Sequence, residues 1–138
     1  QEPANIEALY RLAQAYQKAS MIDKAIEVYE QLLNRHPYWA EALFKLGNLY
    51  YALGMDQKAI TAFENLTQLV PEQATPYYTL ACLYARQDDT EKALATLKLS
   101  IDKGFNNWTN LKINPDLEAI RQTPYHKELK KRHNINEL

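Results

Sequence analysis

The sequence predicts an all-α fold, a solenoid of antiparallel helix hairpins with capping helices at its C-terminal end. One observation is that prolines recur 34 residues apart, at Pro3, Pro37 and Pro71. Other residues recur in the same register: Leu12, Leu46 and Leu80; Tyr16, Tyr50 and Tyr84; Ala25, Ala59 and Ala93. A fixed period of this length is typical of stacked helical hairpins, none of which can bury its apolar face alone.

Three consecutive units follow from this register, at residues 6–39, 40–73 and 74–107. Position 8 of each unit is small: Ala13, Gly47 and Ala81. Position 24 is large and apolar: Tyr29, Phe63 and Leu97. Small residues let two helices approach closely, and large ones fill the space around that contact. We therefore expect the two helices of each hairpin to approach closely at positions 8 and 20, the latter being Ala25, Ala59 and Ala93, with the large residues filling the space around that contact.

Short polar breaks separate the two helices of each unit, at residues 20–23, 53–56 and 87–90. Asp23, Asp56 and Asp89 lie at the ends of these breaks, where a side-chain oxygen can cap the following helix. Pro37 and Pro71 end the second helices, since proline removes a backbone donor and restricts the residue before it.

The chain after the third unit departs from the pattern and predicts a capping segment over residues 108–138. Gly104 ends the preceding helix. Asn114-Pro115 and Thr123-Pro124 are helix-start signals, which predict helices near 115–121 and 124–133. Solenoids need such caps because the last repeat otherwise exposes its core. The expected covering residues are Trp108, Leu111, Leu117, Ile120, Tyr125 and Leu129.

Composition excludes several classes of function. Apolar residues make up 46% of the 138-residue chain and charged residues 24%, as in soluble globular proteins. The net charge of −1 gives no basic surface for nucleic acid. No apolar run approaches the roughly 18 residues of a membrane-spanning helix. We therefore expect neither a nucleic-acid partner nor a membrane partner.

Cysteine and histidine usage argues against redox and metal chemistry. Cys82 is the single cysteine, which excludes an internal disulfide. His36, His126 and His133 share no helical face, and there is no phosphate-binding or catalytic motif. We expect no enzyme activity, cofactor or metal. Cytoplasmic location is favoured, with periplasmic or secreted locations open, because Pro3 stands where a preceding repeat would end and the chain can be a fragment.

The recurring residues resemble the tetratricopeptide repeat. Residues 46–71 match its pattern closely, through Leu46, Gly47, Tyr50, Ala59, Phe63 and Pro71. The resemblance implies a single right-handed solenoid domain over residues 1–138 that binds proteins and has no chemistry of its own. It also implies that positions 2, 5, 6, 9, 12 and 13 of each unit line a concave groove.

Carried over by register, the resemblance predicts a groove rich in rings and amides. Tyr10, Phe44 and Tyr78 form one column at position 5, which the hairpin core does not require. Such rings suit partner binding; the alternative is that they pack against neighbouring helices or an upstream repeat. The predicted groove residues are Tyr10, Gln14, Gln17, Phe44, Lys45, Asn48, Tyr51, Tyr78, Cys82 and Arg86.

Members of the family that bind the tails of heat-shock chaperones hold a terminal carboxylate through particular Lys, Asn and Arg residues. None of them matches the residues at those positions here, which are Tyr10, Gln14, Lys45, Thr75 and Thr79. The first hypothesis is therefore a scaffold-like module that binds another partner peptide or helix in the groove. The alternatives are a structural spacer or self-association segment of a larger repeat or multidomain protein, and a regulatory segment attached to an enzyme.

Overall fold

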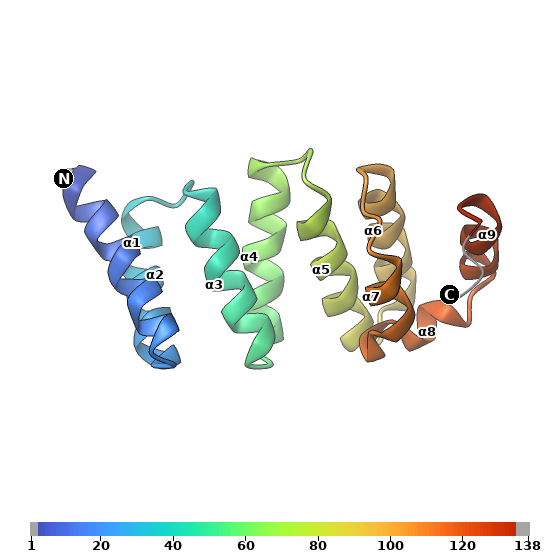
Figure 1. The fold of residues 1–138 in the computed structure, drawn as a ribbon, viewed down its shortest axis with the longest axis horizontal. Coiled ribbons are helices and arrows are strands. Elements are labelled where there is room, and N and C mark those ends of the chain that lie inside the picture. Colours follow the sequence, from blue (N-terminus) through green and yellow to red (C-terminus); the bar gives the residue numbers. More distant parts are fainter. Residues whose placement is uncertain (1–2, 135–138) are drawn as a thin grey trace. The chain divides into compact units, whose positions relative to one another are not determined.

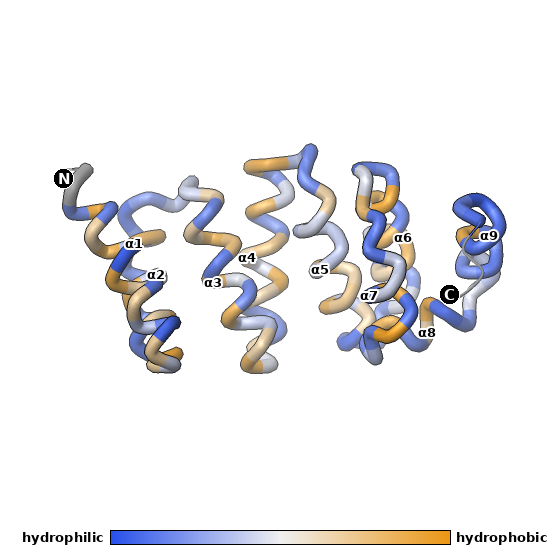
Figure 2. Tube along the Cα trace, viewed as in Figure 1, coloured by the Kyte–Doolittle hydropathy of each residue, from blue (hydrophilic) through white to orange (hydrophobic). Residues whose placement is uncertain are grey.

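The computed structural model describes residues 3–134, which contain helices and no strand. The predicted all-α fold of antiparallel hairpins followed by capping helices is therefore confirmed. The chain divides after Val70 into two compact units, and each is described here by itself. The traces of both units alternate between apolar and polar residues, as expected of amphipathic helices (Figure 2).

The first unit consists of two hairpins (Figure 1). Helix α1 (Pro3–Lys18) pairs with α2 (Ile22–Arg35), α3 (Ala40–Ala52) pairs with α4 (Asp56–Leu69), and α3 also packs on α2. The predicted close approach of the partner helix at position 8 is present in the second hairpin, because a Cβ atom added to Gly47 would lie 3.0 Å from Cε2 of Phe63 on α4. The core is therefore built around a close approach of α3 and α4.

The second unit joins the third hairpin to the cap. Helix α5 (Ala74–Arg86) pairs with α6 (Thr90–Asp102). The cap follows as α7 (Trp108–Ile113), the 3-10 helix η1 (Pro115–Leu117), α8 (Glu118–Arg121) and α9 (Pro124–Arg132). Of its predicted covering residues Trp108 is half-buried, and the others are buried: Leu111, Leu117, Ile120, Tyr125 and Leu129.

The helix starts confirm part of the capping prediction. Asp89 accepts a hydrogen bond from the backbone N of Lys92 at 3.1 Å, and Asn114 caps η1 in the same way. Asp23 and Asp56 instead lie inside the first turns of α2 and α4, where their charge favours the helix N-terminus. The Thr123 hydroxyl donates to a carbonyl of the preceding helix and does not cap α9.

Each hairpin also carries a lysine over a tyrosine ring. The Nζ atoms of Lys24, Lys58 and Lys92 lie 5.8, 5.7 and 4.6 Å from the ring centroids of Tyr16, Tyr50 and Tyr84. A cation over an aromatic face is attractive, by about 0.5–1 kcal/mol at exposed sites. The lysine always stands eight residues after the tyrosine, so this contact joins the start of each second helix to the end of the first.

The turn inside each hairpin places one residue in the left-handed region. Ser20, Gly54 and Asp88 occupy the same register position, with φ of 60°, 72° and 60°. The backbone N of the following residue donates to a carbonyl near the end of the first helix, at 2.8 to 3.0 Å. Only glycine adopts this conformation without steric cost. The first and third turns are therefore strained where the second is not.

Ser20→Gly is expected to raise the free energy of unfolding, since it removes the left-handed strain at that turn. The gain is about 0.5–1 kcal/mol, after the extra entropy of glycine in the unfolded chain. Chemical denaturation would measure it. Ala19→Gly, one residue earlier, is the matched control and should not stabilise; an equal gain from both would contradict the explanation.

Candidate functional site

Tyr10, the first ring of the predicted aromatic column, packs inside the first unit. It is 6% exposed and stacks on Trp39 with ring centroids 4.8 Å apart. Its hydroxyl donates to Oε1 of Glu41 at 2.8 Å. Burial, and then the nearby carboxylate of Glu41, raises the pKa of Tyr10, so the hydroxyl keeps its proton and acts as a donor. Tyr10 therefore joins α1 to α3.

Tyr78, in the second unit, has the same role. It is 6% exposed and stacks on Phe105 with centroids 4.1 Å apart. Its hydroxyl donates to Oδ1 of Asn110 at 3.2 Å and accepts from Nδ2 of Asn114 at 3.1 Å. For Tyr10 and Tyr78 the structure favours the packing alternative, because both rings connect the first helix of a hairpin to the next part of the chain.

The cap covers the remaining predicted groove residues of α5. Cys82 is 1% exposed and its Sγ accepts from Nδ2 of Asn114 at 3.3 Å. Nε of Arg86 lies 3.1 Å from Oδ2 of Asp116. Side chains of the chain's own residues 105–116 thus occupy the face of α5 where the sequence predicts part of the groove.

The sequence did not predict helix α7, which supplies Asn110 to the Tyr78 hydroxyl and ends just before Asn114. Leu111 stands in register with Leu9 and Leu43, and Asn107 accepts a capping bond from the backbone N of Asn110 at 3.0 Å. The sequence therefore held two signals for this helix: a leucine that continues the 34-residue register, and an asparagine able to cap the helix start. Helix α7 therefore begins close to where a fourth unit would begin in the 34-residue register.

On α3, the other predicted residues lie at the surface of the first unit. Phe44 is half-buried, with its ring centroid 6.1 Å from that of Phe63 in an edge contact. Asn48 is exposed and Tyr51 is half-buried. Their spacing of four and three residues places Phe44, Asn48 and Tyr51 on one side of α3.

Next to this side of α3 lies a cavity of about 340 Å³. Its lining residues are Gln14, Gln17 and Lys18 of α1 and Lys45 of α3. Gln14, Gln17 and Lys45 are predicted groove residues, and Lys18 holds position 13 of the first unit. The structure therefore brings together the polar part of the predicted groove in the first unit.

The cavity is rich in positive charge and N–H donors. Neither Lys18 nor Lys45 has an ion-pair partner within residues 3–134. The carboxylates of these two helices are engaged elsewhere: Glu7 pairs with Arg11 at 3.2 Å, and Glu41 accepts from Tyr10. Gln17 Oε1 accepts from the Tyr29 hydroxyl at 3.3 Å, so its NH₂ group is the part left to bond a ligand. Such a cavity suits an oxyanion.

The described part of the chain shows no group of three or more His, Cys, Asp or Glu side chains placed to hold a metal ion. None of the helices between residues 3 and 134 is long and apolar enough to cross a membrane.

Two solved structures are similar to this chain. A crystal structure of MamA has 26% sequence identity and a TM-score of 0.67, covering 71% of this chain and 57% of that one. A chain of the CopN–Scc3 complex has 18% identity and a TM-score of 0.71, covering 98% of this chain and 71% of that one. This chain thus spans little more than half of the MamA chain that it matches.

Family models provide the assignment. A search of curated proteins found no match. Models described as tetratricopeptide repeat match residues 7–37, 40–73 and 74–102. These segments coincide with the three hairpins, and the similar structures share the fold. The chain belongs to the tetratricopeptide repeat family.

Proposed function

We propose that the chain is a non-enzymatic protein-interaction module that binds an acidic peptide segment of a partner protein on the first unit. The observation that carries the proposal is the cavity between α1 and α3. Lys18 and Lys45 both line it without an ion-pair partner among the described residues, and the rest of the lining is amide. An Asp or Glu side chain would supply the missing negative charge and accept from the ammonium and amide groups.

The surface beside the cavity supports a peptide ligand. Phe44, Asn48 and Tyr51 extend it along α3, with exposed or half-buried side chains. Aromatic side chains bury large areas at low entropic cost, and an amide can bond a peptide backbone. The binding surface proposed here therefore comprises Gln14, Gln17, Lys18, Phe44, Lys45, Asn48 and Tyr51.

We favour an internal carboxylate over a chain terminus. The residues with which related chaperone-binding repeats hold a terminal carboxylate are replaced here, among them by the buried Tyr10. The similar CopN–Scc3 structure is a complex, which agrees with a protein partner at the level of the fold.

Terminally blocked hexapeptides with two central glutamates test the proposal by NMR titration. We expect shifts at the backbone amides of Gln14, Lys18 and Lys45, and an affinity that falls as salt is added. Lys18→Gln and Lys45→Gln should each weaken binding about three- to tenfold, the equivalent of roughly 1 kcal/mol.

Two controls accompany the titration. Lys127→Gln, at an exposed lysine of α9, should leave the affinity unchanged. A peptide with glutamine in place of glutamate should not bind. Equal binding of the two peptides, or an affinity that survives both cavity substitutions, would refute the carboxylate site. A free-acid C-terminus that binds more tightly than its amide would show that a terminus is the ligand instead.

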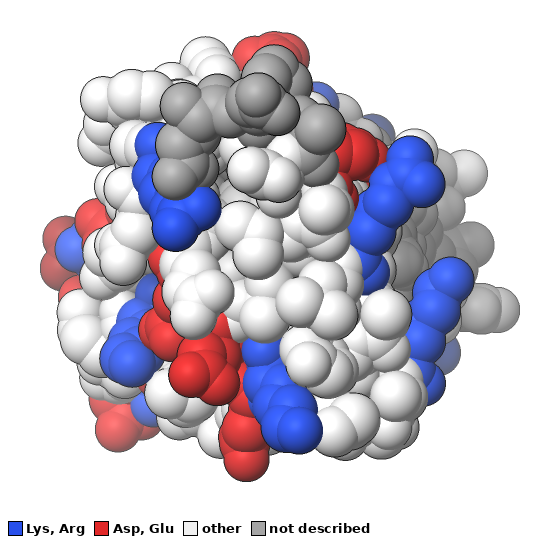
Figure 3. All heavy atoms as spheres, turned by 90° about the vertical axis from the view of Figure 1, so that its left-hand side faces the viewer, with Lys and Arg blue, Asp and Glu red and all other residues white. Residues whose placement is uncertain are grey.

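A structural role has support of its own at the outer face of α1. Leu12 is 41% exposed, whereas Leu46 at the same position of the second repeat is 4% exposed. Ala8 and Ala15 on the same face of α1 are also exposed. Figure 3 views this side of the first unit, where uncharged residues occupy the middle and charged residues the margins. This face suits packing of a further hairpin, and failure of the peptide experiment would favour that function.

A further inference from the structure

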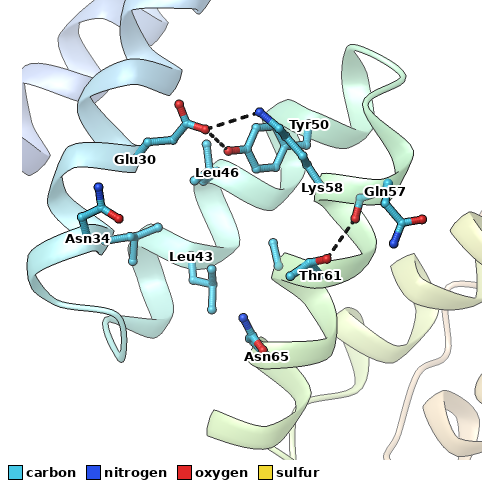
Figure 4. Close-up of a pocket in the computed structure, with 11 residues that line it drawn as sticks. Glu30, Asn34, Leu43, Leu46, Tyr50, Gln57, Lys58, Thr61 and Asn65 are labelled. Atoms are coloured by element: carbon cyan, nitrogen blue, oxygen red, sulfur yellow. Dashed lines mark hydrogen bonds and ion pairs between the residues drawn. The ribbon is translucent and has the colours of Figure 1, made fainter.

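A second surface of the first unit lies between its two outer helices. Helices α2 and α4 form the walls of a trough of about 360 Å³, and α3 forms its floor (Figure 4). The floor and lower walls are apolar, through Leu33, Leu43, Leu46 and Ala62. The trough shares no lining residue with the cavity between α1 and α3.

One end of the trough is closed by a group with balanced charge. The Tyr50 hydroxyl donates to Oε2 of Glu30, and Nζ of Lys58 lies 3.9 Å from the same oxygen (Figure 4). The Lys58 Nζ also lies 5.7 Å from the centroid of the Tyr50 ring. These three residues come from α2, α3 and α4, so the end wall adds no net charge and holds the helices together.

The remaining rim offers uncharged hydrogen-bonding groups. Asn34 on α2 and Asn65 on α4 are exposed, and neither amide has a hydrogen-bond partner in the described part of the chain. Thr61 lies on the α4 wall, with its hydroxyl bonded to the carbonyl of Gln57 at 3.1 Å. The trough is therefore neutral, apolar at its base and lined by amides above.

We propose that this trough docks the apolar face of an amphipathic α-helix from a partner protein, with Asn34 and Asn65 bonding its polar flanks. The rim of the trough carries no net charge, so it matches a partner helix whose apolar face is bordered by uncharged residues. The volume is enough for about two large aliphatic side chains, which lie on one face of a helix at a spacing of three or four residues.

The apolar floor of the trough, together with its helical walls, favours a helix over an extended peptide. The lining residues of α2 and α4 lie within helices, where backbone N–H and C=O groups bond one another. An extended peptide pressed into the apolar floor would bury backbone N–H and C=O groups without partners, whereas a helix arrives with its own backbone bonds already made. The trough therefore lacks what strand-like recognition needs.

Selection from a displayed library of helical and unpatterned peptides on the full chain tests the docking site. We expect selected sequences to carry large apolar residues three or four apart and little net charge. Thr61→Trp, which fills the trough from an exposed position, should weaken their binding at least about tenfold. Asn65→Trp serves the same purpose and stands in if the first variant does not fold.

Matched controls separate this site from the peptide surface proposed above. Ala95→Trp places the same ring at the corresponding exposed position of α6, which does not line the trough, and should leave the affinity unchanged. Lys127→Gln should also have no effect. The trough and the cavity share no lining residue, so failure of this selection leaves the acidic-peptide proposal intact. Selected peptides that bind the Thr61→Trp and Asn65→Trp variants as well as the wild type, or that lack a helical apolar stripe, would overturn the proposal.

Discussion

Truncation after Gly104 is expected to destroy the cooperative unfolding of the second unit. It removes Leu111, Leu117, Ile120 and Leu129, which are at most 1% exposed, and leaves the side chains they cover in water. Tyr78 loses its stacking partner Phe105 and both hydroxyl partners. Single large core truncations cost about 2–5 kcal/mol, so the combined loss reaches roughly the whole 5–15 kcal/mol stability of a small domain.

Thermal and denaturant unfolding of the 1–104 fragment, followed by circular dichroism, would measure this loss. The point variant Leu117→Ala gives an intermediate reference, with an expected cost of about 2–5 kcal/mol. A soluble 1–104 fragment that unfolds at the same midpoint as the full chain would show that the cap does not support the third hairpin.

Gly47→Leu is expected to destabilise the first unit by overpacking it. A Cβ at this position would already lie 3.0 and 3.1 Å from Cε2 and Cζ of Phe63, a ring that is fully buried. Inserting extra carbons into such a contact costs about 1–3 kcal/mol. This cost comes from the Phe63 ring alone, so it should depend on which side chain residue 63 carries.

A double-mutant cycle checks this dependence. Phe63→Ala alone should cost about 3–5 kcal/mol through the cavity it leaves. In that background Gly47→Leu should cost much less, or should stabilise, because the leucine enters the vacated space. The interaction free energy from denaturation midpoints should be about 1–3 kcal/mol in the favourable direction. Additive effects of the two changes would contradict the contact between α3 and α4.

The hairpin contacts could be predicted because they lie inside one period. Position 8 faces the partner helix of the same unit, so three copies of the pattern report the same local packing. Ala13, Tyr29 and Phe63 are accordingly fully buried. Leu12 shows the limit of this reasoning, since a residue that repeats is buried only where a neighbouring helix covers it.

The aromatic column could not be assigned from the repeat alone. Tyr10 packs because Trp39 and Glu41 lie beside it, and Tyr78 packs because the cap supplies Phe105 and two asparagines. These partners lie about one period further along the chain and differ between units. The binding surface on the first unit stays a prediction, now with Lys18 added.

The trough could not be read from the sequence because it depends on how far apart α2 and α4 stand. Leu43 and Leu46 carry the same pattern whether the space above them is filled or open. Only the positions of α2, α3 and α4 in the structure show that the space above Leu43 and Leu46 is open and bounded by α2 and α4.

Because residues 105–116 cover α5, the proposed binding surface is confined to α1 and α3, which limits the length of motif that it can contact. With that face occupied, the proposed surface rests on two neighbouring first helices, whose axes are about 8–10 Å apart. An extended chain advances roughly 3.3 Å per residue, so about three residues bridge the two helices. A motif this short gives modest affinity alone. Useful occupancy would then come from partners that repeat the motif, where each binding event raises the effective concentration for the next.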